Sequence, residues 1–230
     1  MTRLRNILVG RRVAVIDADD TLWYNARYYA EFIDRVVDLM VTERMGDCNA
    51  ARRSLSLQVE SADPGERGFA DSVIAFVRTS GGSRCFVRQV VELANLFAEH
   101  PVKLLPDARL AVRRLPSQIK LLYTKGVEAE QIRKIKASGM KGDFDEVIVT
   151  KRKSAEQLSN LLGERGIAGP DVLAIGNSIR HDVVPAVSLG AAAIWFNHPE
   201  NLYGDNGRLP AEAMQVRGWD AVLDALQLST

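Results

Sequence analysis

The sequence predicts an α/β protein: a doubly wound, mainly parallel sheet with an inserted α-helical domain. Three observations predict it. A short run of mostly β-branched residues, Val13–Ile16, is typical of a buried strand and stops at acidic residues. Residues 26–100 carry helical spacing throughout, whereas after residue 101 short apolar runs alternate with helical segments. Such alternation builds a parallel sheet covered by helices on both faces, so the long helical segment is an insertion.

The first strand and the insertion divide the chain into two predicted domains. Apolar residues of the insertion recur at three- and four-residue spacing, as in Tyr29, Phe32, Ile33, Val36, Val37 and Met40. This spacing places them on one helix face. We therefore expect residues 24–100 to form a helical cap, and residues 1–23 and 101–230 to form the core domain.

The core domain continues with four more predicted strands. They are Ile119–Tyr123, Val147–Val149, Val172–Ile175 and Ala192–Phe196. The segments between them have helical patterns, starting near Pro106, over 128–137, over 154–165 and ending near Leu189. In open α/β sheets, ligands bind beyond the carboxyl ends of the strands. We therefore expect the polar residues that follow these strands to form one site.

Composition excludes several classes of function. The chain has 230 residues, 47% hydrophobic and 26% charged, with a formal net charge of +1. This balance favours neither nucleic acid nor an anionic membrane as a partner. Cys48 and Cys85 are too few for a disulfide framework or a zinc site. With neither a secretory signal nor a membrane-spanning apolar run in the pattern, we expect a cytoplasmic monomer or homodimer.

Acidic residues crowd the end of the first strand. Asp17, Asp19 and Asp20 lie within four positions, where mutual repulsion raises the cost of keeping all three ionised. Other predicted strands also end in polar residues: Thr124 in one case, and Gly176-Asn177 in another. The cluster indicates either a site that binds positive charge or an exposed acidic turn.

Four sequence motifs carry a resemblance to a known family. They are D-x-D-x-T-L at 17–22, Thr124 closing the LLYT strand, a lysine in VTKRKSAEQL, and a G-D-x-x-x-x-D-like motif at 176–182. In this order, the motifs resemble the haloacid dehalogenase-like (HAD) hydrolase superfamily, in its phosphatase branch with a helical cap after the first motif. The resemblance covers the whole chain and implies a Rossmann-like core.

The resemblance implies a role for each catalytic residue. Asp17 would be the nucleophile that forms an aspartyl-phosphate. Asp19 would be the general acid and base. Thr124 and Lys153 would bind and neutralise the transferring phosphoryl group, and Lys151 is the alternative to Lys153.

The resemblance also implies Mg²⁺ as cofactor. Its expected ligands are Asp17, Asp19, Asp182 and Asn177, which offer the oxygen atoms that Mg²⁺ prefers. We count two more residues, Asp20 and Lys125, in the expected phosphate-binding set. The chain departs from the family pattern twice, since Asp20 stands where glycine is common and Asn177 stands where many members carry an aspartate.

Together the motifs predict a Mg²⁺-dependent phosphohydrolase acting on a small phosphorylated metabolite. Two alternatives remain open: a phosphomutase on the same core, and a non-catalytic relative that binds phosphorylated ligands. The resemblance disfavours a dehalogenase, because that branch lacks the second acid and Asp19 is present.

Overall fold

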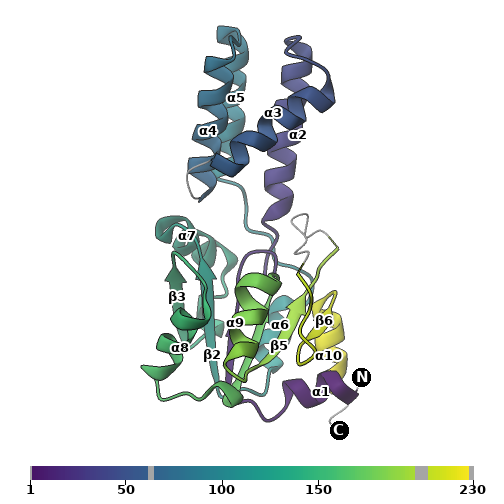
Figure 1. The fold of residues 1–230 in the computed structure, drawn as a ribbon, viewed down its shortest axis with the longest axis vertical. Helices are drawn as coiled ribbons and strands as arrows, with labels where there is room; N and C mark the ends of the chain where they lie inside the picture. The colour runs from purple at the N-terminus through teal and green to yellow at the C-terminus, as the bar shows by residue number, and fades with distance from the viewer. Residues whose placement is uncertain (1, 62–64, 200–206, 228–230) are drawn as a thin grey trace. The chain divides into compact units, whose positions relative to one another are not determined.

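A computed structural model describes residues 2–61, 65–199 and 207–227 (Figure 1). The chain divides into two compact units: a core unit, Met1–Ala26 with Val102–Thr230, and a cap unit, Arg27–Pro101. The sequence placed these boundaries at residues 24 and 101. In the structure the cap unit begins at Arg27, three residues later, and the core unit resumes at Val102, one residue later.

The core unit contains one six-stranded parallel sheet in the order β3-β2-β1-β4-β5-β6. The strands are β1 Val13–Ile16, β2 Ile119–Lys125, β3 Glu146–Thr150, β4 Val172–Gly176, β5 Ala192–Phe196 and β6 Met214–Val216. The five predicted strands and the α/β fold class are confirmed. Strand β6 was not predicted, because its three residues are too few to show a pattern.

Register brings the ends of the central strands together. Ile16, the last residue of β1, pairs with Leu122 of β2 and with Ile175 of β4. The polar residues that follow these strands therefore lie side by side at one edge of the sheet. The backbone N–H of Asp17 continues this pairing by donating to the Ile175 carbonyl at 2.9 Å.

Helices cover both faces of the sheet, as a doubly wound fold requires. They are α1 Thr2–Leu8, α6 Ala108–Arg114, α7 Glu128–Ser138, α8 Ala155–Gly163, α9 Val184–Ser188 and α10 Trp219–Gln227. Short turns of other helix types are η1 Lys141–Asp143, η2 Gly169–Asp171 and η3 Ile179–Val183. On one face, Val15 and Ala174 pack with Leu158 of α8 in a single apolar cluster. On the other face, Ile16 and Leu122 are also buried.

The cap unit is helical, as predicted, and has a core of its own. Its helices are α2 Ala26–Thr42, α3 Cys48–Ser61, α4 Gly65–Thr79 and α5 Arg84–Ala98. Phe32, Phe69 and Phe97 pack against one another there, with ring centroids 4.8–5.9 Å apart. The apolar stripes of these helices are thus used for packing within the unit.

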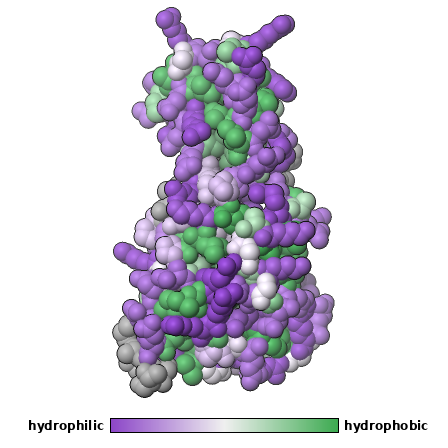
Figure 2. All heavy atoms as spheres, turned by 180° about the vertical axis from the view of Figure 1, so that it is seen from behind, coloured by the Kyte–Doolittle hydropathy of each residue, from purple (hydrophilic) through white to green (hydrophobic). Residues whose placement is uncertain are grey.

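The surface shows no large apolar face in the view of Figure 2, where hydrophilic residues separate the hydrophobic ones into several groups. Among the residues whose burial is described, the exposed large hydrophobic side chains come from separate segments: Val9, Val41, Leu96, Leu110, Val127 and Val184. None of the helices in the described ranges is both long and apolar enough to cross a membrane.

Candidate active site

The loop after β1 is held by its own hydrogen bonds. The Thr21 hydroxyl donates to Oδ2 of Asp17 at 2.9 Å, and the Leu22 N–H donates to the Ala18 carbonyl at 2.8 Å. Asp20 adopts a positive φ of 55°, which closes the turn. Asp17 is left at the end of β1 with 8% of its surface exposed.

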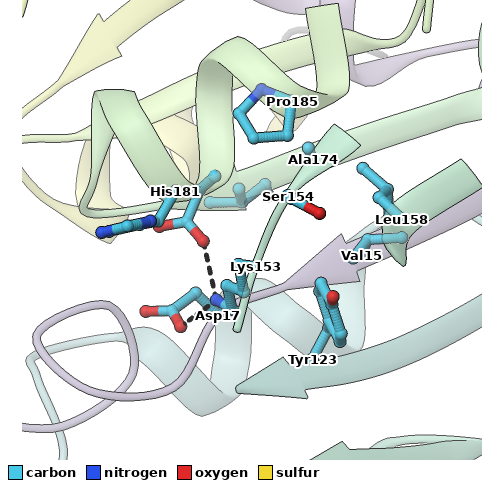
Figure 3. A pocket seen from close by; sticks show the side chains of 11 residues that line it. Val15, Asp17, Tyr123, Lys153, Ser154, Leu158, Ala174, His181 and Pro185 are labelled. Carbon is cyan, nitrogen blue, oxygen red and sulfur yellow. Dashed lines mark hydrogen bonds and ion pairs between the residues drawn. The ribbon is translucent and has the colours of Figure 1, made fainter. Parts of the chain in front are cut away.

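Lys153 lies between two carboxylates (Figure 3). Its ammonium group donates to Oδ1 of Asp182 at 2.7 Å and to Oδ1 of Asp17. Lys153 is 7% exposed, whereas Lys151 is exposed to solvent. Of the two lysines that the sequence left open, Lys153 is the one that the structure brings to Asp17.

Little water can reach this ion pair. The cavity lined by Asp17, Tyr123, Lys153, His181 and Asp182 has a volume of about 10 Å³, roughly the space for one water molecule. Burial opposes a charged lysine, but the charges of Asp17 and Asp182 outweigh it and raise the pKa of Lys153. The ammonium group is therefore held in its charged form.

Burial is the main influence on the ionisation of Asp17. Burial raises the pKa of Asp17 to about 7, Lys153 acts to lower it, and Asp182 raises it further. One lysine shared by two carboxylates does not neutralise both of them. With both carboxylates ionised, they and Lys153 would carry a net charge of −1 together.

Asp182 is engaged on both oxygens. Oδ1 accepts from Lys153, and Oδ2 accepts from the backbone N–H of Ser178 at 3.0 Å. Gly176 makes room for it, because a Cβ built at Gly176 would lie 2.3 Å from Cγ of Asp182. Asp182 thus orients Lys153 in this structure, and its predicted role as a metal ligand stays a prediction.

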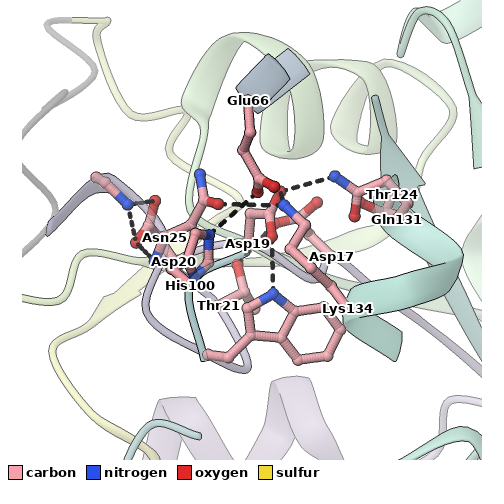
Figure 4. A network of polar contacts seen from close by, with 12 residues as sticks. Asp17, Asp19, Asp20, Thr21, Asn25, Glu66, His100, Thr124, Gln131 and Lys134 are labelled. Carbon is pink, nitrogen blue, oxygen red and sulfur yellow. Dashed lines mark hydrogen bonds and ion pairs between the residues drawn. The ribbon is translucent and has the colours of Figure 1, made fainter. Parts of the chain in front are cut away.

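Asp19 is surrounded by three hydrogen-bond donors (Figure 4). Trp23 Nε1 donates to Oδ1 at 2.7 Å, whereas Gln131 Nε2 and Lys134 Nζ donate to Oδ2 at 2.9 and 2.7 Å. Gln131 and Lys134 were not singled out from the sequence, where the segment 128–137 has the pattern of a polar helix. As whole residues, Gln131 is 4% exposed and Lys134 is 2% exposed. This burial depends on the segments that pack against α7, which the sequence pattern does not show.

Thr124 lies at the end of β2, buried and next to α7. Its hydroxyl donates to Oε1 of Gln131 at 3.3 Å, a long hydrogen bond. Lys125, the next residue, is exposed to solvent. Burial of the His181 ring is the main cause that lowers the pKa of His181, and the charge of Lys125 lowers it further. The structure therefore places Thr124, but not the ammonium group of Lys125, in the contact network of Asp19.

Asp20 has a different environment from the other acids. Its Oδ1 accepts from the backbone N–H groups of Asn25 and Ala26 at 2.9 and 3.0 Å, and Oδ2 accepts from Ala26 at 3.1 Å. Burial raises the pKa of Asp20 to about 6, and these hydrogen bonds act to lower it. Asp20 therefore anchors the start of α2, and no contact supports its predicted role in binding phosphate.

The residues at this edge offer oxygen atoms, which fits Mg²⁺ better than a softer metal. Asp17 and Asp19 follow β1, and Asn177 follows β4, where its carbonyl also accepts from Trp195 Nε1 at 2.9 Å. Within 2–61, 65–199 and 207–227, no three His, Cys, Asp or Glu side chains group as a metal site. A cation here would therefore depend on carbonyl, amide or water oxygens beside the carboxylates.

Comparisons with known proteins identify the fold. A scan against protein-family models and a search of curated proteins return no match. Among solved structures, a haloacid dehalogenase-like family hydrolase from Xanthomonas campestris is 23% identical with a TM-score of 0.77, covering 95% of this chain and 97% of that chain.

Three further structures match at similar coverage. A HAD phosphatase from Thermococcus onnurineus is 21% identical with a TM-score of 0.59, over 94% of this chain and 97% of its own. The Bacillus subtilis protein YfnB, bound to magnesium, is 16% identical with a TM-score of 0.62, over 94% and 98%. A 2-haloacid dehalogenase from Pseudomonas syringae also matches, so this likeness spans two chemistries. The chain has the haloacid dehalogenase-like fold, with a helical cap inserted after the first strand.

Proposed function

We propose that this protein is a phosphohydrolase that removes phosphate from a small phosphorylated metabolite through Asp17. The observation that carries the proposal is the contact of Asp17 with the buried Lys153. Asp19, two residues after Asp17, is held in place by three hydrogen-bond donors. This arrangement supplies a nucleophile, a fixed positive charge and a second acid at one strand end.

In the first step, an oxygen of Asp17 attacks phosphorus and the bond from phosphorus to the ester oxygen breaks. Asp19 gives its proton to the departing oxygen. Lys153 is held in its charged form by Asp17 and Asp182, and it offsets the charge on the phosphoryl group. The products of this step are the free alcohol and a phosphorylated Asp17.

In the second step, water attacks the phosphorylated Asp17 and Asp19 takes a proton from that water. The bond between Asp17 and phosphorus breaks, which regenerates the carboxylate and releases inorganic phosphate. Thr124 can turn its hydroxyl from Gln131 to a phosphoryl oxygen at little cost, because the bond to Gln131 is 3.3 Å long.

Magnesium belongs to the same proposal. The residues that would hold it are Asp17, Asp19 through its main-chain carbonyl, Asp182 and Asn177. When bound, it would supply positive charge that lets an anionic phosphate approach the anionic Asp17. The raised pKa of Asp17, caused first by burial, supports a need for such charge.

Asp19 favours phosphate chemistry over dehalogenation. A departing halide needs no proton, so a positioned acid two residues after the nucleophile has no use in that reaction. A departing alkoxide does need one. A phosphomutase shares the same chemistry up to the phosphorylated Asp17, and differs in returning the group to a sugar.

The test measures phosphate release from a panel of phosphorylated metabolites, with Mg²⁺ and with a chelator. We expect release only with the metal, and a loss of at least about 10³-fold in Asp17→Asn, since removing a nucleophile abolishes covalent catalysis. Binding of phosphorylated compounds without any release would favour the non-catalytic alternative. Full turnover by Asp17→Asn would refute the proposed nucleophile.

A further inference from the structure

We infer that Lys134 and Gln131, both on α7, are positioning residues that hold Asp19 in its reactive orientation. The inference rests on the proposed function, since it assigns the orientation of the proposed acid to a second element. The two side chains lie three positions apart on one helix, so they point to the same side of it. Figure 4 shows both reaching Asp19 from α7.

The contacts hold both oxygens of the Asp19 carboxylate. Trp23 Nε1 lies 2.7 Å from Oδ1, while Gln131 Nε2 and Lys134 Nζ both lie within 2.9 Å of Oδ2. Trp23 comes from the same loop as Asp19, so on its own it leaves the far oxygen unconstrained. The α7 pair supplies that constraint from a different part of the core unit.

The orientation of the Gln131 amide follows from its two partners. The amide nitrogen faces Asp19, since Gln131 Nε2 donates to Oδ2 of Asp19 at 2.9 Å. The amide oxygen then accepts from the Thr124 hydroxyl at 3.3 Å. Gln131 thus links the proposed acid with the proposed phosphate-binding hydroxyl.

Burial shows that the position of Lys134 is specific. Its side chain is 3% exposed, and a lysine is almost never buried to that extent unless it is paired. Its ammonium group contacts Asp19 at 2.7 Å and Oδ1 of Asn25 at 3.1 Å. A surface salt bridge would instead leave both partners in water and free to move.

The turn after β2 is shaped to admit Gln131. Gly126 has a φ of 158°, and a Cβ built there would lie 2.7 Å from Nε2 of Gln131. Any larger residue at this position would push the amide away from Asp19. The absence of a side chain at Gly126, two residues after Thr124, therefore leaves the space that the Gln131 side chain occupies.

A positioning role predicts that damage depends on the leaving group. The test compares kcat/KM for p-nitrophenyl phosphate, whose leaving group needs little proton donation, with kcat/KM for the best alkyl phosphate of the panel. Because kcat/KM reports the steps up to departure of the leaving group, it isolates the step in which Asp19 gives its proton. The variants are Lys134→Met, Lys134→Arg and Gln131→Leu, and the matched control is Lys136→Met, an exposed lysine of the same helix.

We expect Lys134→Met to lose about 100-fold on the alkyl ester and less than about 5-fold on the aryl ester, since general acid catalysis contributes about 10²–10⁴-fold. Lys134→Arg, which keeps charge and donors, should recover at least about a tenth of the parent activity on the alkyl ester. Gln131→Leu should show the same leaving-group bias at smaller size, and Lys136→Met should match the parent.

Equal losses on both esters, or no loss on either, would overturn the inference. If Lys134→Met fails to fold, as judged by its thermal transition, Gln131→Leu and Lys134→Arg still decide the question through the ratio of the two kcat/KM values. An inactive parent would refute the proposed function, whereas an active parent without leaving-group bias in the variants would refute only the positioning role.

Discussion

Removing the charge of Lys153 tests the central ion pair of the site. In Lys153→Met, Asp17 and Asp182 would stay buried and lose the cation that they share. Their side chains are 9% and 8% exposed, so water cannot replace the ammonium group. Breaking a buried pair by removing one partner costs about 3–5 kcal/mol, because an uncompensated charge is left behind.

This loss is measurable by urea unfolding in the presence of a chelator. With an m value of about 3 kcal/mol/M, a loss of about 3 kcal/mol moves the midpoint down by about 1 M. All three tryptophans, Trp23, Trp195 and Trp219, lie in the core unit, so their fluorescence reports the unit that contains the ion pair. Unfolding of the cap unit therefore does not obscure the signal.

The matched control is Lys151→Met, which removes an exposed lysine two residues away. It should change stability by less than about 0.5 kcal/mol, as surface substitutions usually do. Adding Asp182→Asn to Lys153→Met should restore part of the loss, because one buried charge is then removed. A loss below about 1 kcal/mol in Lys153→Met, or an equal loss in the control, would refute the argument that Lys153 balances buried carboxylates.

Other substitutions test how the site is built. Gly176→Ala should lower the free energy of unfolding by about 1–3 kcal/mol and reduce phosphate release, because its Cβ would displace the Asp182 carboxylate. In the same urea unfolding assay the control Gly163→Ala, at an exposed position, should be neutral or stabilising. Asp20→Ala should lower the free energy of unfolding by about 1–2 kcal/mol, because the N–H of Ala26 loses its acceptor, and Asp20→Asn should cost less. A urea midpoint equal to that of the parent in Asp20→Ala would contradict the anchoring role.

Local patterns were sufficient to predict the sheet and the reactive acids. A buried parallel strand is a short apolar run, and the residue after it lies at the ligand-binding edge whatever else surrounds it. This is why Asp17, Asp19 and Thr124 could be chosen from the sequence, and why the five longer strands were found. The order of motifs along the chain carried the resemblance, which the fold comparison supports.

The tertiary structure decided which polar side chains face those acids. The family resemblance favoured Lys153 over Lys151, and the packing of the segment after β3 decided between them by burying Lys153 against Asp17. Gln131 and Lys134 belong to a helix with a polar sequence, and the burial of such residues depends on a partner more than a hundred positions away. Periodicity records the side of an element on which a residue lies, but the partner of a buried charge is set by the packing of distant segments.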